Sequence, residues 1–182
     1  MNKNNYLCVT LPDAWRDALS SFCHALGDDN FRPMEHDDLH MTFCFLGEHM
    51  QHMKREKIVG LHSELVETQK GIVIQPNFQR FTLFPPEKMN VLVVVLEGFP
   101  AAVQGRHGDV VRIMSAGTGD DIAAKNNSNW LPHITLGKIQ GPAGAAQEVL
   151  AAAQRLADGF SVAGGCVSRD TSNGRCPDFF MP

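Results

Sequence analysis

Apolar residues along the chain follow two repeat lengths, one typical of strands and one typical of helices. Strand-like alternation or continuous apolar runs occupy four stretches: residues 6–11, 39–46, 72–96 and 132–139. Apolar positions three and four residues apart, which form one face of a helix, occupy four more: residues 13–26, 49–69, 99–114 and 143–158. Short strands interspersed with amphipathic helices predict a domain of the α/β or α+β class.

Residues that start and stop helices mark the ends of the two clearest ones. Asp13 is a good N-cap for helix 13–26, and Gly27 ends that helix. Its apolar face recurs at steps of four, three and four residues: Trp15, Leu19, Phe22 and Leu26. Pro142 and Gly159 frame helix 143–158 in the same way. Its inward face is predicted to hold Val149, Leu150, Ala153, Leu156 and Ala157.

The remaining segments are read from turn residues and glycines. Pro85, Pro86 and Asn90 predict the turn of a hairpin within residues 72–96. Gly105 and Gly108 each weaken helix 99–114 by about 1 kcal/mol. Residues rich in Gly, Asp, Asn and Ser predict a loop over 115–130, and residues 160–180 read as one or two strands around a turn at 172–174.

Composition indicates in which compartment the protein works. The longest apolar run in the 182 residues is 91–96, whereas a membrane span needs roughly 18 residues. The N-terminal apolar stretch is too short for a signal peptide, so we expect a mature, unexported protein. We expect it to be cytoplasmic and monomeric. The odd number of cysteines, with no C-x-x-C pair, fits buried thiols in a reducing compartment. These are Cys8, Cys23, Cys44, Cys166 and Cys176.

The overall charge limits the class of ligand. The net charge is −4 and the pI is about 6.0, which disfavours a protein that binds long nucleic acid through many phosphate contacts. A ligand with only a few phosphates remains compatible with this charge.

Two short segments repeat one pattern, an apolar strand that carries His and Thr two residues apart. The first holds His40 and Thr42, and the second, about half the chain later, holds His133 and Thr135. Side chains at i and i+2 of a strand share a face, so each His emerges beside its Thr while the residues between them face the core. One such pair alone is typical of a half-exposed strand. Two copies predict two similar lobes that place their pairs across one cleft.

Two imidazoles and two hydroxyls on one cleft suit phosphodiester chemistry without a metal. Histidine titrates near neutral pH, so one ring acts as a base and the other as an acid. Threonine hydroxyls donate hydrogen bonds to the non-bridging phosphate oxygens, where charge builds in the transition state.

The segments FRPMEHDDLHMTFCFLGEH and NWLPHITLGKI resemble the two signature motifs of the two-histidine phosphoesterase superfamily, which includes 2′-5′ RNA ligase-like proteins and cyclic nucleotide phosphodiesterases. The resemblance implies an α+β fold over residues 1–182, a single domain of two pseudo-twofold lobes with two antiparallel sheets and flanking helices around a central cleft. It implies a nucleotide or RNA-end substrate with a 2′,3′-cyclic phosphate or a 2′-5′ linkage.

By the same resemblance, His40 and His133 are acid and base, and Thr42 and Thr135 bind the phosphate. For hydrolysis of a cyclic phosphate we assign His133 to activate water and His40 to protonate the departing ribose oxygen. The reversed assignment leaves the set of residues intact.

Other candidates rest on single residues. Phe84 and Trp130 are expected to stack a nucleobase, with core packing as the alternative. A basic residue beside the phosphate is expected from the chemistry, but the sequence singles none out. His36, Asp37 and Asp38 next to His40 fit no zinc spacing and are read as a loop. No cofactor or metal is expected, and no phosphate-binding loop is visible.

Three functions therefore compete. The first is a metal-independent phosphodiesterase for 2′,3′-cyclic phosphates, with cleavage of 2′-5′ oligoadenylates or trimming of RNA 3′ ends as variants on the same residues. The second is a nucleotide-binding adaptor with little turnover. The third is a structural domain whose polar pairs lie in separate places.

Overall fold

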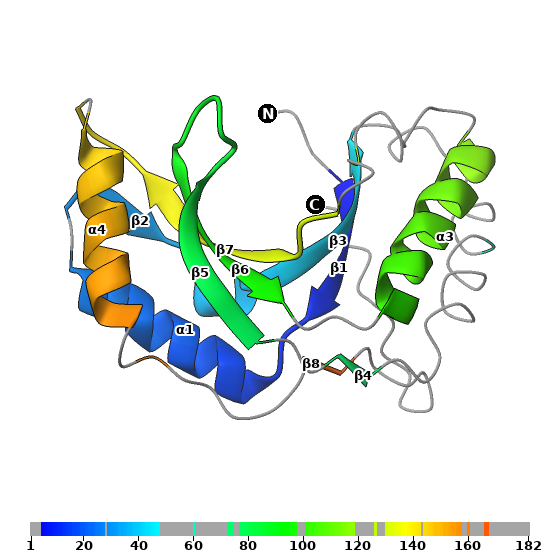
Figure 1. Cartoon of the computed structure of the whole chain (residues 1–182), viewed down its shortest axis with the longest axis horizontal. Coiled ribbons are helices and arrows are strands. Elements are labelled where there is room, and N and C mark those ends of the chain that lie inside the picture. The colour runs from blue at the N-terminus through cyan, green and yellow to red at the C-terminus, as the bar shows by residue number, and fades with distance from the viewer. Residues whose placement is uncertain are drawn as a thin grey trace.

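A curved antiparallel sheet with helices outside it forms the described part of the molecule (Figure 1). The computed structural model describes residues 5–27, 29–47, 60, 73–74, 77–97, 101–118, 126, 130–142, 144–157, 160 and 166–167. In chain order the elements are β1 (Asn5–Thr10), α1 (Asp13–Leu26), β2 (Phe31–Pro33), a 3₁₀ turn η1 (His36–Asp38), β3 (His40–Gly47), β4 (Val73–Ile74), β5 (Asn77–Phe84), β6 (Val91–Glu97), α3 (Ala101–Thr118), β7 (His133–Ile139), α4 (Ala145–Ala157) and β8 (Cys166–Val167). None of the described helices is long and apolar enough to cross a membrane.

The main sheet joins strands from both halves of the chain. Its order is β1-β3-β7-β6-β5, with β2 paired to β7, and all of these pairs are antiparallel. Strands β6 and β7 pair along most of their length, whereas the register between β3 and β7 is a single pair, Met41 with Ile134. The two halves of the sheet therefore meet closely at one point, and the predicted arrangement of two separate lobes is not confirmed.

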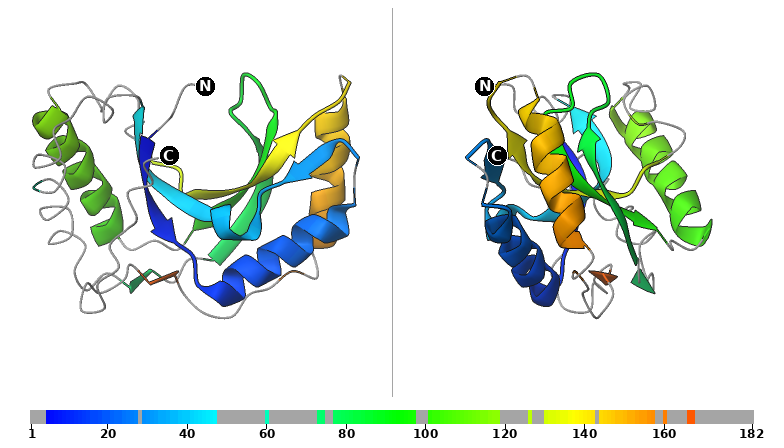
Figure 2. Two further views of the ribbon diagram at one scale, coloured as in Figure 1. Left: turned by 180° about the vertical axis from the view of Figure 1, so that it is seen from behind. Right: turned by 60° about the vertical axis from the view of Figure 1, so that its left-hand side comes forward.

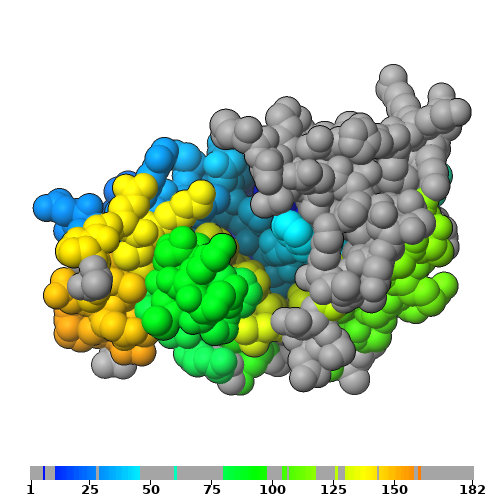
Figure 3. Space-filling model, turned by 90° about the horizontal axis from the view of Figure 1, so that it is seen from above, coloured from blue at the N-terminus to red at the C-terminus, as the bar shows by residue number. Residues whose placement is uncertain are grey.

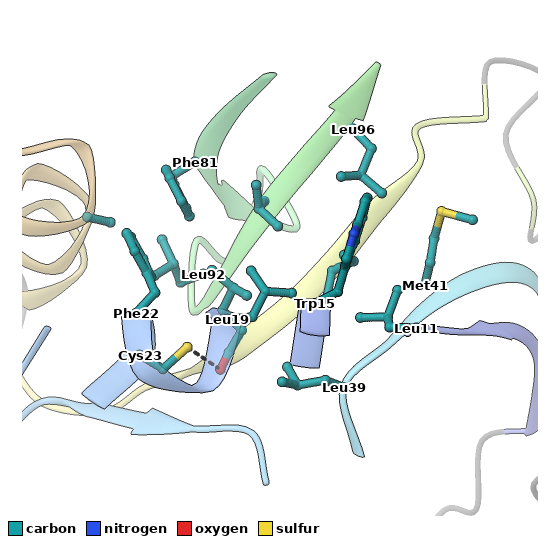
Figure 4. Packing of buried hydrophobic residues seen from close by; sticks show 14 of the residues in the cluster. Leu11, Trp15, Leu19, Phe22, Cys23, Leu39, Met41, Phe81, Leu92 and Leu96 are labelled. Atoms are coloured by element: carbon teal, nitrogen blue, oxygen red, sulfur yellow. Dashed lines mark hydrogen bonds between the residues drawn. The ribbon is translucent and has the colours of Figure 1, made fainter. Parts of the chain in front are cut away.

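Helices α1 and α4 lie against one face of this sheet, and α3 lies beyond its β1–β3 end (Figures 1 and 2). The core under α1 contains Trp15 and Leu19, which are 1% and 0% exposed. The thiol of Cys23 donates a hydrogen bond to the carbonyl of Leu136 over 3.6 Å (Figure 4). This apolar face holds the strands in place and leaves the opposite, concave face of the sheet for polar side chains.

Helix α1 has the predicted bounds and ends at the predicted glycine, but its N-cap is a different residue from the predicted one. Its four predicted apolar positions are all buried, because a helix on a sheet buries one stripe. Gly27 ends it in the left-handed conformation, with φ at 55°. The sequence predicts Asp13 as the N-cap, but Pro12 occupies that position, and Asp13 is the first helical residue, paired with Arg16.

Helices α3 and α4 match the predictions less closely. Helix α3 extends to Thr118, so the loop predicted from residue 115 begins too early. In α4, Val149 and Ala153 are fully buried and Leu150 and Ala157 pack on the core. Leu156 is 38% exposed, so its predicted inward position is wrong. The helix ends at the next residue, so its last turn lies at the margin of the packed face.

The predicted hairpin is confirmed, since β5 and β6 pair from Asn77–Glu97 to Phe84–Val91 around the proline turn. Two predictions lie outside the described residues, namely the helix over 49–69 and the turn at 172–174. Of the predicted C-terminal strands, the described residues contain β8, which pairs with β4. The short strand β2 has no counterpart among the predicted elements. Cys23 and Cys44 are buried free thiols, and burial raises the pKa of each to about 12.

Candidate active site

Strands β3 and β7 begin with the two motif histidines, and the sheet sets them side by side. Because β3 and β7 are antiparallel and Met41 pairs with Ile134, His40 lies opposite Thr135 and Thr42 lies opposite His133. Met41 and Ile134 are both 0% exposed on the core side. Alternation along a strand places the four motif residues together on the other face, where all four side chains are partly exposed.

The separation of the two histidines follows from the geometry of the sheet. Residues directly opposite each other have Cα atoms about 4.5–5.5 Å apart, and diagonal neighbours are about 7–8 Å apart. His40 and His133 occupy a diagonal of this square. Thr42 and Thr135 occupy the other diagonal.

Both imidazoles are held in the same way by the backbone. The Nδ1 atom of His40 bonds the carbonyl of Asp38 over 2.6 Å, and that of His133 bonds the carbonyl of Leu131 over 2.8 Å. A carbonyl only accepts, so Nδ1 carries the hydrogen in each ring. Nε2 is therefore the nitrogen that takes up or releases a proton at the sheet surface.

The environments of the two rings differ in charge. Burial lowers the pKa of His133, and the Leu131 bond opposes this. Burial also lowers the pKa of His40, assisted by the nearby charge of His133 and opposed by the Asp38 carbonyl and the Asp38 carboxylate. His40 therefore has an anionic neighbour, the Asp38 carboxylate, that favours its protonated form. No such charge is among the causes that shift the pKa of His133.

An aromatic ring packs on each histidine. Tyr6 of β1 stacks on His40, with ring centroids 4.7 Å apart and planes 8° apart. Phe84, at the end of β5, contacts His133 with a centroid distance of 4.9 Å and a tilt of 35°. These rings restrict the rotation of the imidazoles and shield them from water on one side.

A cavity of about 690 Å³ opens beside the motif residues. Its lining residues come from β3, the β5–β6 turn, α3 and the segment before β7: Thr42, Phe43, Phe45, Phe84, Pro85, Pro86, Glu87, His107, Asn126, Trp130, Leu131 and His133. Viewed from above, the surface is hollowed next to the β5–β6 turn, with β3 on the floor (Figure 3). This volume is in the range of small-molecule sites.

The cavity contains some of the predicted site residues and adds others. Thr42, His133, Phe84 and Trp130 line it, while His40 and Thr135 complete the square on the sheet beside it. Trp130 also packs on the core through an edge-to-face contact with Phe43, at a centroid distance of 4.9 Å. Trp130 therefore lies at the boundary between the core and the cavity, a position that is compatible both with stacking on a base and with core packing.

Sequence reasoning missed four residues that the fold brings to this region. Tyr6 lies in a predicted strand, but nothing in the strand pattern links it to His40. Glu87 sits in the predicted turn, and His107 lies in a helix that contacts β3. The Asn126 side chain donates to the Phe45 carbonyl and accepts from the Phe45 amide, each over 2.8 Å. These contacts span long sequence separations, so no local pattern indicates them.

The acidic segment before β3 is a 3₁₀ turn, where the sequence suggests a loop. His36 bonds Asp17 and Asp37, each over 2.9 Å, and these bonds raise its pKa. Within the described ranges, no group of three or more His, Cys, Asp or Glu side chains is arranged to hold a metal ion. No Lys or Arg is found among the cavity-lining residues that are described.

No model of a known protein family matches this sequence, and no curated protein matches it either. Solved structures do match the fold. A structure described as a phosphoesterase has a TM-score of 0.54 and 19% identity, covering 75% of this chain and 72% of the other. TT0787 of Thermus thermophilus has a TM-score of 0.55 and 21% identity, with coverages of 77% and 76%. E. coli LigT complexed with 3′-AMP has a TM-score of 0.57 and 21% identity, with coverages of 79% and 76%.

The chain shares the fold of these solved structures. Identities near 20% show a shared fold and leave the chemistry to be argued from the residues of this chain. The match confirms the α+β class, and its antiparallel sheet with flanking helices is the one that carries both His-x-Thr pairs.

Proposed function

We propose that this protein is a metal-independent phosphodiesterase that opens 2′,3′-cyclic phosphates on RNA ends or small nucleotides. The observation that carries the proposal is the square of His40, Thr42, His133 and Thr135 on one sheet face, with both histidines bound at Nδ1 by a carbonyl. This arrangement offers two Nε2 atoms and two hydroxyls to one phosphoryl group. The fold shared with a LigT structure that contains 3′-AMP supports a nucleoside phosphate as the ligand class.

In the proposed reaction, neutral His133 accepts a proton from water at Nε2 while the water oxygen attacks phosphorus. The bond from phosphorus to one ribose oxygen breaks, and protonated His40 delivers its Nε2 proton to that oxygen. The product is a ribose monophosphate with one free hydroxyl, and solvent then returns the proton balance of the two histidines. Thr42 and Thr135 donate hydrogen bonds to the non-bridging oxygens as negative charge builds there.

The surroundings of the two rings favour this assignment of acid and base. The Asp38 carboxylate favours protonated His40, and the face of Tyr6, stacked on the ring, also attracts a cation. His133 has Phe84 as its ring neighbour and no comparable anionic influence among the causes that shift its pKa. His40 therefore retains a proton more readily and suits the acid, while His133 suits the base.

The test compares His40→Ala and His133→Ala with a matched control, His24→Ala. His24 is an exposed histidine on α1, outside the cavity, whose ring bonds the Ser20 carbonyl. With 2′,3′-cyclic nucleotides in the presence of EDTA, we expect each site variant to lose roughly 10²- to 10⁴-fold in kcat, the usual contribution of one acid or base, and the control to keep its activity. Near-normal turnover in either site variant would overturn the two-histidine mechanism.

The same residues serve the related reactions, so substrate choice needs its own measurement. A panel of 2′,3′-cyclic nucleotides, 2′-5′ and 3′-5′ dinucleotides and short RNAs with defined 3′ ends separates ring opening from 2′-5′ cleavage and from end trimming. Binding of nucleotides by calorimetry, with no product after long incubation, would instead support the nucleotide-binding adaptor.

A further inference from the structure

His107 is a nearly buried histidine at the wall of the cavity. It lies on α3, is 7% exposed and contributes to the cavity lining. Its ring is stacked on Trp130, with centroids 5.1 Å apart and planes 8° apart, and meets Phe43 edge to face at 5.7 Å. Among the described residues, neither ring nitrogen of His107 has a hydrogen-bond partner.

No nitrogen of His107 is among the fully buried side-chain atoms that lack a hydrogen-bond partner in the described part of the chain, so the polar edge of this mostly buried ring is the part that reaches the cavity. An apolar side chain of the same shape would pack between Trp130 and Phe43 equally well. Burial lowers the pKa of His107, so the ring is neutral near pH 7 and offers one N–H donor and one acceptor nitrogen. Such a ring suits a neutral polar edge better than a phosphate.

The position of His107 relative to the motif residues indicates which part of a ligand would reach it. The cavity includes Thr42 and His133 of the motif square and extends to His107 and Trp130. A nucleotide with its phosphate on the square therefore places its nucleoside part toward α3. The aromatic surroundings of His107 match a flat ring with a polar edge more closely than they match a sugar.

We propose that His107, held by Trp130, forms hydrogen bonds to the edge of the nucleobase and sets the base preference of the enzyme. This inference rests on the proposed function, since it assumes a nucleotide with its phosphate on the motif square. It adds a specificity-determining residue on α3 that is distinct from the acid, the base and the phosphate binders.

The test uses His107→Phe, which keeps a flat ring and removes both nitrogens, and His107→Gln, which keeps a donor and an acceptor. Both are assayed on the 2′,3′-cyclic phosphates of adenosine, guanosine, cytidine and uridine, and on glycerol 1,2-cyclic phosphate, which has no base. We expect His107→Phe to reduce the ratio of kcat/KM between the best and worst nucleotide by roughly three- to tenfold, the value of one neutral hydrogen bond. Activity on the glycerol compound should stay unchanged, and His107→Gln should retain part of the base preference.

Unchanged base ratios in a folded His107→Phe variant would overturn the inference. An equal loss on all substrates, including the glycerol compound, would also overturn it and assign His107 to the fold or the chemistry. Equal losses on all four nucleotides, with the glycerol compound spared, would assign it to the ribose and overturn base recognition. Thermal melting of both variants identifies any that fail to fold.

A second measurement separates this inference from the proposed function. Calorimetry with 3′-AMP, 3′-GMP, 3′-CMP and 3′-UMP needs no turnover. If the wild-type protein hydrolyses none of the substrates, the proposed function fails. The inference then stands if His107→Phe narrows the spread of the four dissociation constants, and it fails if that spread is unchanged.

Discussion

At the scale of single residues, the site depends on how the two imidazoles are tied to the backbone. Each Nδ1 is bound to the carbonyl two residues earlier, so the Nε2 atoms that the proposed reaction uses are oriented before any ligand arrives. The aromatic contacts of Tyr6 and Phe84 add further restriction. Preorganised groups avoid the cost of reorientation during the reaction, which is a main source of catalytic power.

The pH dependence of activity follows from the lowered pKa of both rings. Burial places the pKa of His40 and of His133 below the ordinary value of about 6.5. The proposed reaction needs one protonated and one neutral histidine in the free protein, a state that is most populated between the two macroscopic pKa values. We therefore predict a bell-shaped profile of kcat/KM with its maximum below about pH 6.5.

Steady-state kinetics across the acidic and neutral range measure this profile. The profile of kcat should lie at higher pH than that of kcat/KM, because the bound phosphate anion favours the protonated rings. A maximum of kcat/KM on the alkaline side of neutrality would contradict burial as the dominant influence on these histidines.

At the scale of elements, β7 is the strand on which the two halves of the sheet depend. It pairs with β3, β6 and β2, and the close approach of β2 requires a glycine. A Cβ added at Gly137 would lie 2.5 Å from the Arg32 carbonyl oxygen and from the Phe31 ring. Gly137 follows Thr135 by two residues, so this packing also supports the strand that holds the motif.

A glycine-to-alanine substitution in β7 tests this packing, and the same substitution at an open site in α3 serves as the comparison. Gly137→Ala should lower the free energy of unfolding by about 1–3 kcal/mol, because the added methyl group forces backbone or ring atoms apart. Gly105→Ala in α3 should raise it by roughly 0.5–1 kcal/mol, because the site is open and helical alanine has less chain entropy to lose. Chemical denaturation of both variants gives the comparison, and equal effects would contradict the role of β2 packing.

Some helices and strands could be predicted from the local sequence pattern, and others could not. Helix α1 has its predicted bounds and four buried positions, because its apolar spacing and its glycine stop agree. Strand β2 has three residues and is stabilised by pairing with β7, a contact that no local signal indicates. The loop starts later than predicted because α3 continues past the buried Ile113 and Met114 through residues 115–118, although serine and glycine there have weak helix propensity.

At the scale of the whole molecule, several histidines link stability to pH. Burial lowers the pKa of His40, His107 and His133, so below about pH 6.5 the unfolded chain binds more protons than the folded one. Stability should therefore fall as the pH decreases from about 6.5 through the folded-state pKa values. His36 acts in the opposite direction through Asp37 and Asp17, but its exposed position weakens the effect.

Urea unfolding at about pH 7.5 and about pH 5.5, on either side of the ordinary histidine pKa, measures this linkage. We predict a lower free energy of unfolding at the acidic pH in the wild-type protein and a smaller decrease in the folded variant His107→Phe, which has one buried histidine fewer. Stability that is constant or rising toward the acidic pH would show that the buried rings are protonated at little cost.

The sequence alone determined the class of fold, the main helix and hairpin, and the two His-x-Thr pairs with the face of the strand that each shares, because periodicity and turn chemistry act over a few residues. The tertiary structure decided that β3 and β7 are neighbours, that the pairs form one square, and that Tyr6, Asn126 and His107 lie around them. These contacts join residues tens of positions apart. They depend on how the sheet closes and how the helices pack on it, which no short stretch of sequence encodes.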